Sequence, residues 1–294
     1  MNKSPLTLRN SLSGVVLVLA LVSISSGVSW AQSSGSAKPV AGTSGSGPAS
    51  SINAQFEYDL KVTVDASKRS AYLARSKEEP SPYESVYKIV SGSMTVATVV
   101  DQVKIDSAKY HISSKGTLLA GMSTALGGQN LIRDSVGTMS ATGMLTNTYQ
   151  EKRGNTDLLL AKVEVPKNIV NFYKVSSRTP PVGTAPYTGR LLDMLTVGYQ
   201  FIGRELPAKS VVLPVTDGRS VKNYTLVRGE SLEVPFDGSK IKAVRYYKTT
   251  SKDDNATFEI WFSEKGHIPL RSVVGLSDQY GATIQLDLKK MPKF

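Results

Sequence analysis

The second half of this chain alternates strictly between apolar and polar residues. After Pro207 the alternation comes in short runs, and Asp-Gly pairs at 217–218 and 237–238 each separate two of them. A period of two places one face of a strand in a core, and Asp-Gly favours a hairpin because a type I′ turn needs positive φ at both central residues. With no helical pattern between the runs, they predict an antiparallel sheet. The predicted strands are 211–216, 221–227, 232–236, 241–249, 257–263, 268–276 and 282–288.

The same alternation marks the beginning of the ordered chain. Every second residue from Phe56 to Val64 is apolar, which predicts a strand with one buried face. A charged, proline-containing stretch at 68–82 follows, and we expect it to be an excursion from the sheet. Further strands are predicted at 83–90, 93–105, 130–139, 146–151, 156–165 and 169–176.

One segment has a different period. Leu191, Leu195, Tyr199, Ile202 and Leu206 recur at helical spacing and Pro207 ends the pattern, which predicts one α-helix at about 188–206 of about five turns. A twisted meander with one apolar face must close on itself or cover that face. We therefore expect a mainly β protein, a single curled antiparallel sheet or partly open β-barrel, capped by this helix.

The first 31 residues have the three-part layout of a secretory signal. Lys3 and Arg9 precede an uncharged apolar run at 14–24, and small residues flank Trp at 29–31. This pattern predicts a cleaved signal peptide at 1–31, a periplasmic protein and no transmembrane segment after cleavage. An uncleaved membrane anchor is the alternative. The chain has no cysteine, so it is not a lipoprotein acylated at a cleavage-site cysteine.

Composition predicts the remaining domain organisation. Residues 32–53 are rich in Gly, Ser, Ala and Pro with one charge, which is typical of a flexible linker. We expect one antiparallel β domain at 54–288 and a short C-terminal tail at 289–294. The predicted core must form without disulfides, because there is no cysteine.

Charge and residue types limit the classes of partner. The chain has 35 lysines and arginines against 24 acidic residues, and a positive field favours proximity to anionic envelope polymers and lipids. The absence of any run of five like charges favours the simpler alternative, a solvated surface with scattered lysines. No basic-aromatic cluster suggests nucleic acid. With no cysteine and only His111 and His267, we expect no metal site and no cofactor.

Catalytic signatures are also missing. No G-x-S-x-G nucleophile motif occurs. His111 lies in an alternating segment and His267 in a predicted turn, positions more typical of structural or exposed histidines than of general bases. We therefore predict no catalytic residue and no enzymatic activity.

Four residues are candidates for ligand binding. On the predicted strand 257–263, Glu259 and Trp261 point away from the core, and Arg271 on the next strand shares their face. Tryptophan beside a guanidinium is either a cross-strand packing pair or part of a ligand groove. Asp193, early in the predicted helix, either complements the helix dipole or contacts a ligand.

Several short motifs occur in a fixed order. They are SVG at 135–137, GM…Y at 143–149, DMLT at 193–196, LPVTDGR at 213–219 and IWF…IPLR at 260–271. Together they resemble the family of exported bacterial proteins catalogued as domain of unknown function 3108.

The resemblance covers about 56–288, and Thr146 stands where that family usually has proline. It implies a Gram-negative periplasmic protein with a curled antiparallel sheet, and it implies no known activity.

These observations lead to three hypotheses for function. The first is a non-catalytic binding or envelope-maintenance protein that holds a hydrophobic or amphiphilic ligand, such as a lipid, in a curled sheet. The second is an envelope assembly or scaffold factor that contacts another protein or peptidoglycan. The third is a hydrolase of envelope polymers that uses paired carboxylates.

Overall fold

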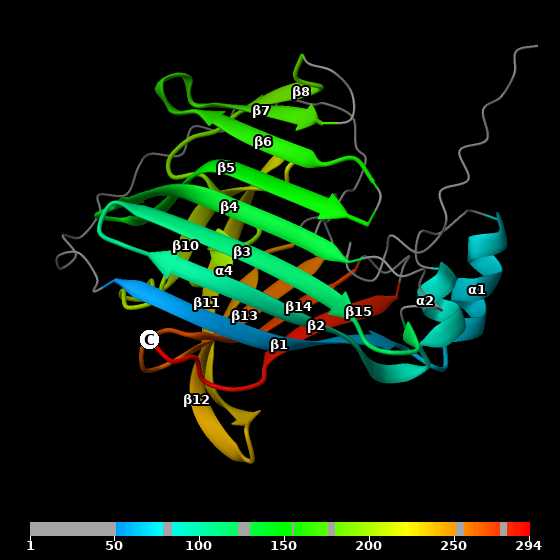
Figure 1. Cartoon of the computed structure of the whole chain (residues 1–294). Helices are drawn as coiled ribbons and strands as arrows, with labels where there is room; N and C mark the ends of the chain where they lie inside the picture. The colour runs from blue at the N-terminus through cyan, green and yellow to red at the C-terminus, as the bar shows by residue number, and fades with distance from the viewer. Residues whose placement is uncertain are drawn as a thin grey trace, which may run out of the picture.

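The computed structural model describes residues 51–78, 84–122, 130–154, 156–175, 180–250, 256–276 and 281–294. Within these residues, fifteen strands form one curled sheet with three short α-helices (Figure 1). The predicted signal peptide lies outside the described residues, as does all but the end of the predicted linker. No described helix is long and apolar enough to cross a membrane.

The chain divides at its middle into two meanders. The first contains β1 (Ile52–Val64), α1 (Arg69–Glu78), α2 (Glu84–Ile89), β2 (Gly92–Ile105), β3 (Lys109–Leu118), β4 (Leu131–Ser140), β5 (Gly143–Arg153), β6 (Leu159–Glu164), a 3-10 turn (Val165–Lys167), β7 (Ile169–Lys174) and β8 (Gly183–Pro186). The second contains β9 (Leu192–Asp193), α4 (Thr196–Tyr199), β10 (Ser210–Thr216), β11 (Val221–Phe236), β12 (Ser239–Lys248), β13 (Thr257–Ser263), β14 (Pro269–Gly275) and β15 (Ala282–Leu288).

β1 joins the two meanders at the centre of the sheet. It pairs antiparallel with β2 on one side and with β15 on the other, so the sheet runs from β8 at one edge to β9 at the opposite edge. β1 begins at Ile52, two residues before the predicted start of the β domain at 54. Its even-numbered residues are buried along its whole length. The strict alternation of this strand therefore places one face of the whole sheet inside.

The sheet curls until its edge strand β9 meets β5. The Thr146 N–H on β5 donates a 3.0 Å hydrogen bond to the carbonyl of Leu191, directly before the edge strand β9. β9 pairs parallel with β10, whereas the other neighbouring strands pair antiparallel. The predicted fold class, a mainly β protein with a single curled sheet, is confirmed.

The two Asp-Gly pairs both form hairpin turns, by different means. At the β11–β12 turn Asp237 has φ 44° and Gly238 has φ 72°, the positive pair that a type I′ turn requires. At the β10–β11 turn only Gly218 has positive φ, and the Asp217 carboxylate accepts hydrogen bonds from two following backbone N–H groups at 2.9 Å each. That loop is therefore built on an Asx turn.

The predicted five-turn helix at 188–206 is wrong. Only α4 is helical in this segment, and Gly203 at φ 67° is incompatible with a continuous helix. Every residue from 191 to 202 except Gly198 is buried, so this segment, here named the plug, is surrounded by the sheet. Apolar residues on all sides cannot mark one helical face. The buried polar side chains of the plug also hydrogen-bond to its own backbone and compete with a helix.

The excursion before β2 contains helices. α1 and α2 occupy this region, so the strand predicted at 83–90 is wrong. The rings of Tyr72 and Tyr87, one from each helix, stack with centroids 5.3 Å apart. Tyr87 and Val90 are both buried, and this spacing of three suits a helix. Six residues are too few for the sequence period to distinguish the two structures.

Candidate functional site

Trp261 and Arg271 lie directly opposite each other on β13 and β14. Both are on the outer face of the sheet and both are partly buried. Their strands are joined by the turn at 264–268, and a register shift between Trp261 and Phe262 brings Trp261 opposite Arg271. The outer face is therefore the first place to examine for a site.

Trp261 belongs to a cluster in which the charged side chains pair with each other. The guanidinium carbon of Arg245 lies 5.7 Å from the Trp261 ring centre and 5.3 Å from that of Tyr247. Arg245 also donates two hydrogen bonds to the Glu259 carboxylate, at 2.6 and 3.0 Å. Arg245, and not Arg271, therefore stacks on Trp261, and Glu259 is occupied within the cluster.

We expect Trp261→Ala to lower the free energy of unfolding by about 1–3 kcal/mol, because buried aromatic area and the contact with Arg245 are lost. Urea unfolding measures this change, with Trp261→Phe as a milder control that keeps an aromatic face for Arg245. A variant of unchanged stability that has lost a bound ligand would contradict the packing role.

Arg271 has a different environment. Its Nε donates a 2.5 Å hydrogen bond to Asp287, whose carboxylate also accepts from Lys61 at 2.8 Å and from Gln285 at 2.7 Å. Burial raises the pKa of Asp287, but these hydrogen bonds and the nearby charge of Arg271 outweigh burial and hold that pKa below its usual value. The Asp287 carboxylate thus binds two cationic side chains. The terminal nitrogens of Arg271 have no hydrogen-bond partner among the described residues.

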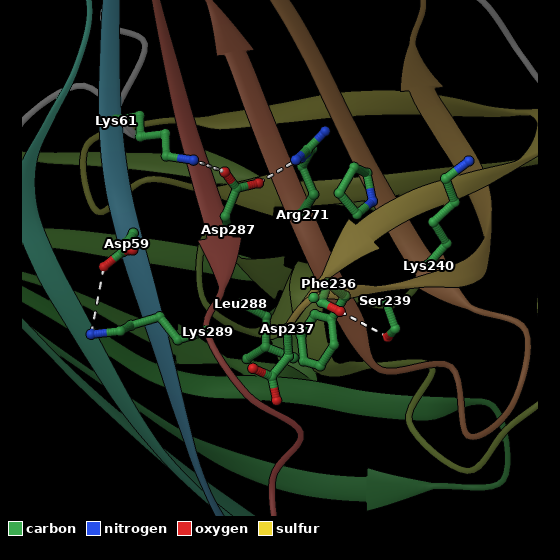
Figure 2. A pocket seen from close by; sticks show the side chains of 12 residues that line it. Asp59, Lys61, Phe236, Asp237, Ser239, Lys240, Arg271, Asp287, Leu288 and Lys289 are labelled. Carbon is green, nitrogen blue, oxygen red and sulfur yellow. Dashed lines mark hydrogen bonds and ion pairs between the residues drawn. The ribbon is translucent and has the colours of Figure 1, made fainter.

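Arg271 lines a groove of about 600 Å³ on the outer face (Figure 2). One wall consists of β1, β14 and β15, and the other is the β11–β12 hairpin around its type I′ turn. Figure 2 shows the end of the Arg271 side chain directed away from Asp287. The charged lining residues are Lys61, Lys240, Arg271 and Lys289 with Asp59, Asp237 and Asp287, and the apolar lining residues include Pro235, Phe236 and Leu288.

The other cations of the groove have partners. Lys289 lies 2.8 Å from Glu57 and 3.7 Å from Asp59, and the exposed Lys240 lies 3.4 Å from Glu233. Arg271 therefore offers the two terminal guanidinium nitrogens to a groove that apolar side chains also line. No cluster of three metal-ligating side chains occurs in the described ranges.

Asp193 lies inside the sheet and is fully buried. One carboxylate oxygen accepts from the backbone N–H groups of Leu195 and Thr196 at 2.8 and 3.0 Å. The other accepts from the hydroxyls of Ser135 at 2.5 Å and Thr146 at 2.8 Å. Burial raises the pKa of Asp193 while these hydrogen bonds oppose the rise. Asp193 ends β9 and anchors the plug, so the structure separates it from the three outer residues.

A buried acidic residue was missed by the sequence reasoning. Glu151 on β5 is 1% exposed and lies 2.5 Å from Arg153 and 3.7 Å from Arg219 of the β10–β11 turn. The Tyr149 hydroxyl also donates to Glu151 at 3.1 Å. Position 151 shares a face with Tyr149, so the strand alternation is the signal that could have placed this carboxylate inside.

Comparison with known proteins finds a family model that matches most of this chain. Residues 83–289 match the family model described as a protein of unknown function (DUF3108). The chain belongs to this family. A similar solved structure is the beta-barrel-like protein of domain of unknown function DUF1849 from Brucella abortus. It has a TM-score of 0.45 and 12% sequence identity, over 83% of this chain and 98% of that chain. No curated protein gives a significant match.

In this DUF3108 protein, the SVG motif lies at the join between the sheet and the plug. A Cβ on Gly137 would lie 2.0 Å from the Leu145 carbonyl and 2.6 Å from the Tyr110 ring, so only glycine fits there. The Tyr110 hydroxyl can then approach Ser135 at 3.2 Å and Thr146 at 3.1 Å, beside the Asp193 carboxylate. These motif residues therefore stabilise the fold, whereas the outer groove is the candidate binding site.

Proposed function

We propose that this protein is a non-catalytic binding protein of the bacterial cell envelope, and that it holds an anionic amphiphile in the outer groove. The supporting observation is Arg271, whose terminal guanidinium nitrogens have no partner among the described residues and which lines the same groove as Phe236 and Leu288. A guanidinium pairs well with carboxylate or phosphate. The apolar side chains offer a surface for the adjoining hydrocarbon.

The outer groove suits such a ligand better than the interior of the sheet. The plug fills the interior and leaves a cavity of about 60 Å³, whereas the groove has about 600 Å³. Sites for ligands of ordinary size have roughly 300–1,000 Å³. The proposed ligand therefore lies on the outer face, and the hypothesis of a lipid inside the curled sheet is replaced by this one.

Carboxylate-based hydrolysis fits the groove less well. Asp59 and Asp287 occupy directly paired positions on β1 and β15, so two acids are close together there. Hydrolysis by two carboxylates needs one of them protonated as a general acid. The cations around Asp287 lower its pKa, and Asp59 lies 3.7 Å from Lys289. This arrangement favours an ionised Asp287 and a binding role.

The envelope location rests on the sequence. The predicted signal peptide directs export, and the excess of 35 basic over 24 acidic residues favours a site among anionic lipids. Phospholipids with a phosphate head and hydrocarbon tails match the chemistry of the groove.

We expect Arg271→Ala to weaken binding of lyso-phosphatidylglycerol to the delipidated protein by about tenfold or more, because a charge-assisted pair is lost. Native mass spectrometry below the micelle concentration measures the bound fraction. The melting temperature should change little, because Asp287 keeps Lys61 and Gln285 as partners. Lys115→Ala is the matched control, since this exposed residue of β3 lies outside the groove and carries the same charge.

Equal binding by wild type, Arg271→Ala and Lys115→Ala would contradict the groove as the site. Retention of an envelope protein after delipidation, with no lipid bound to wild type, would favour the scaffold hypothesis instead.

A further inference from the structure

The interior of the curled sheet has one polar and one apolar wall. Asp101, Ser114, Arg133 and Glu151 occupy directly paired positions across β2, β3, β4 and β5, and all four are buried. The inward residues of β13, β14 and β15 that line this space are apolar instead, apart from Ser272 on β14. This difference gives the interior an amphipathic character.

A small cavity separates the two walls. Its volume is about 60 Å³, and the plug closes one side. Tyr58, Asp101, Arg133 and Tyr199 line its polar part. Val197, Ile260, Val274 and Ile284 are among its apolar lining residues.

The polar wall has unsatisfied groups. Asp101 accepts a 2.5 Å hydrogen bond from the Tyr199 hydroxyl, and Arg133 donates one to Ser114 at 3.3 Å. Asp101 is only 6% exposed and Arg133 only 4% exposed. Asp101 Oδ1 and Arg133 Nε nevertheless have no hydrogen-bond partner among the described residues. A buried polar atom without a partner is energetically unfavourable. Asp101 and Arg133 thus each carry one polar atom without a partner, and both residues line the same cavity.

We propose that this cavity is a second binding site, for a small neutral molecule with a hydroxyl group on a short aliphatic chain. Asp101 and Arg133 are one acid and one base, so a charged guest would enter a low-dielectric site without a counter-charge. A hydroxyl group can both donate to a carboxylate and accept from a guanidinium. The hydrocarbon then lies against the apolar wall, in a space that fits only a few carbon atoms.

The test uses 1-butanol as the probe, with butyrate and butylammonium as charged probes of the same length. Methyl NMR of the mature protein follows the δ-methyl groups of Ile260 and Ile284. We expect saturable shifts with 1-butanol and only weak, linear shifts with the two charged probes.

Two variants of one strand separate the cavity from general solvent effects. Val274→Leu extends a side chain into the cavity and should weaken 1-butanol binding about tenfold, since an added methylene in a packed site is not accommodated. Val273→Leu makes the same change on the opposite face of β14 and should bind like wild type. Both variants should keep the wild-type spectrum elsewhere.

A third variant tests the electrostatic argument. Asp101→Asn removes the acid and leaves Arg133 without its counter-charge, so binding should shift from 1-butanol towards butyrate. A structural role of Asp101 alone would not reverse this preference. Linear shifts for wild type with all probes, equal binding by Val274→Leu, or a crystal soaked in 1-butanol that shows only ordered water in the cavity would each overturn the proposal.

Discussion

Asp193→Ala should lower the free energy of unfolding by about 3–5 kcal/mol. The Asp193 carboxylate accepts four hydrogen bonds, two from backbone N–H groups of the plug and two from hydroxyls on β4 and β5. Alanine leaves all four donors buried, and the site is closed to water because Asp193 is 0% exposed. The plug would then lose its attachment to the sheet.

Asp193→Asn is the matched control for this prediction. The amide oxygen can still accept from the plug backbone, and the Ser135 and Thr146 hydroxyls can rotate to accept from the amide NH₂ group. We expect a cost of about 1–2 kcal/mol for this variant. Urea unfolding, followed by fluorescence with the slope m compared between variants, measures both changes. A loss below about 1 kcal/mol for Asp193→Ala would show that the plug is held by apolar packing alone.

Glu151→Ala should cost about 3–5 kcal/mol, because removal of one partner from a buried ion pair leaves the other charge uncompensated. Glu151 lies 2.5 Å from Arg153 of its own strand and 3.7 Å from Arg219 at the other end of the sheet. Burial lowers the pKa of Arg153, and the charge of Glu151 opposes this lowering, so loss of Glu151 leaves the burial of the guanidinium uncompensated. The substitution removes the carboxylate that connects β5 to the β10–β11 turn.

Glu230→Ala provides the comparison for Glu151. Glu230 also pairs with an arginine, at 3.3 Å from Arg245, but its side chain is 55% exposed. Exposed pairs of this kind contribute about 0–1 kcal/mol. Equal midpoints of urea unfolding for the two variants would contradict a special role of Glu151 in closing the sheet.

The candidate site was partly predictable from the sequence. The tight turn at 264–268 and the alternation of β13 and β14 were sufficient to predict that Trp261 and Arg271 share the outer face, which the register confirms. The groove itself was not predictable. Its second wall is the β11–β12 hairpin, and no local pattern tells how far that hairpin bends back over β15.

The choice of partners was decided by geometry as well. Trp261 has an arginine on each neighbouring strand, Arg245 on β12 and Arg271 on β14. Asp287 binds Arg271, and Arg245 is the one that stacks on the indole. Alternation fixes the face of each residue, but the rotamers of long side chains depend on all their charged neighbours.

The sequence by itself determined the clearly alternating strands, such as β1 and β13, with their inward faces and the hairpin turns, because a period of two and an Asp-Gly pair act through the local backbone. Only the tertiary structure decided the plug. Residues 191–202 are apolar enough to suggest a helix, yet they are enclosed by the sheet on all sides, and Asp193 bonds to their backbone in place of a regular helix. The buried charges of Glu151 and Asp193 depend on residues more than 40 positions away. The local sequence does not predict such contacts, because they form only when the sheet curls and brings distant strands together.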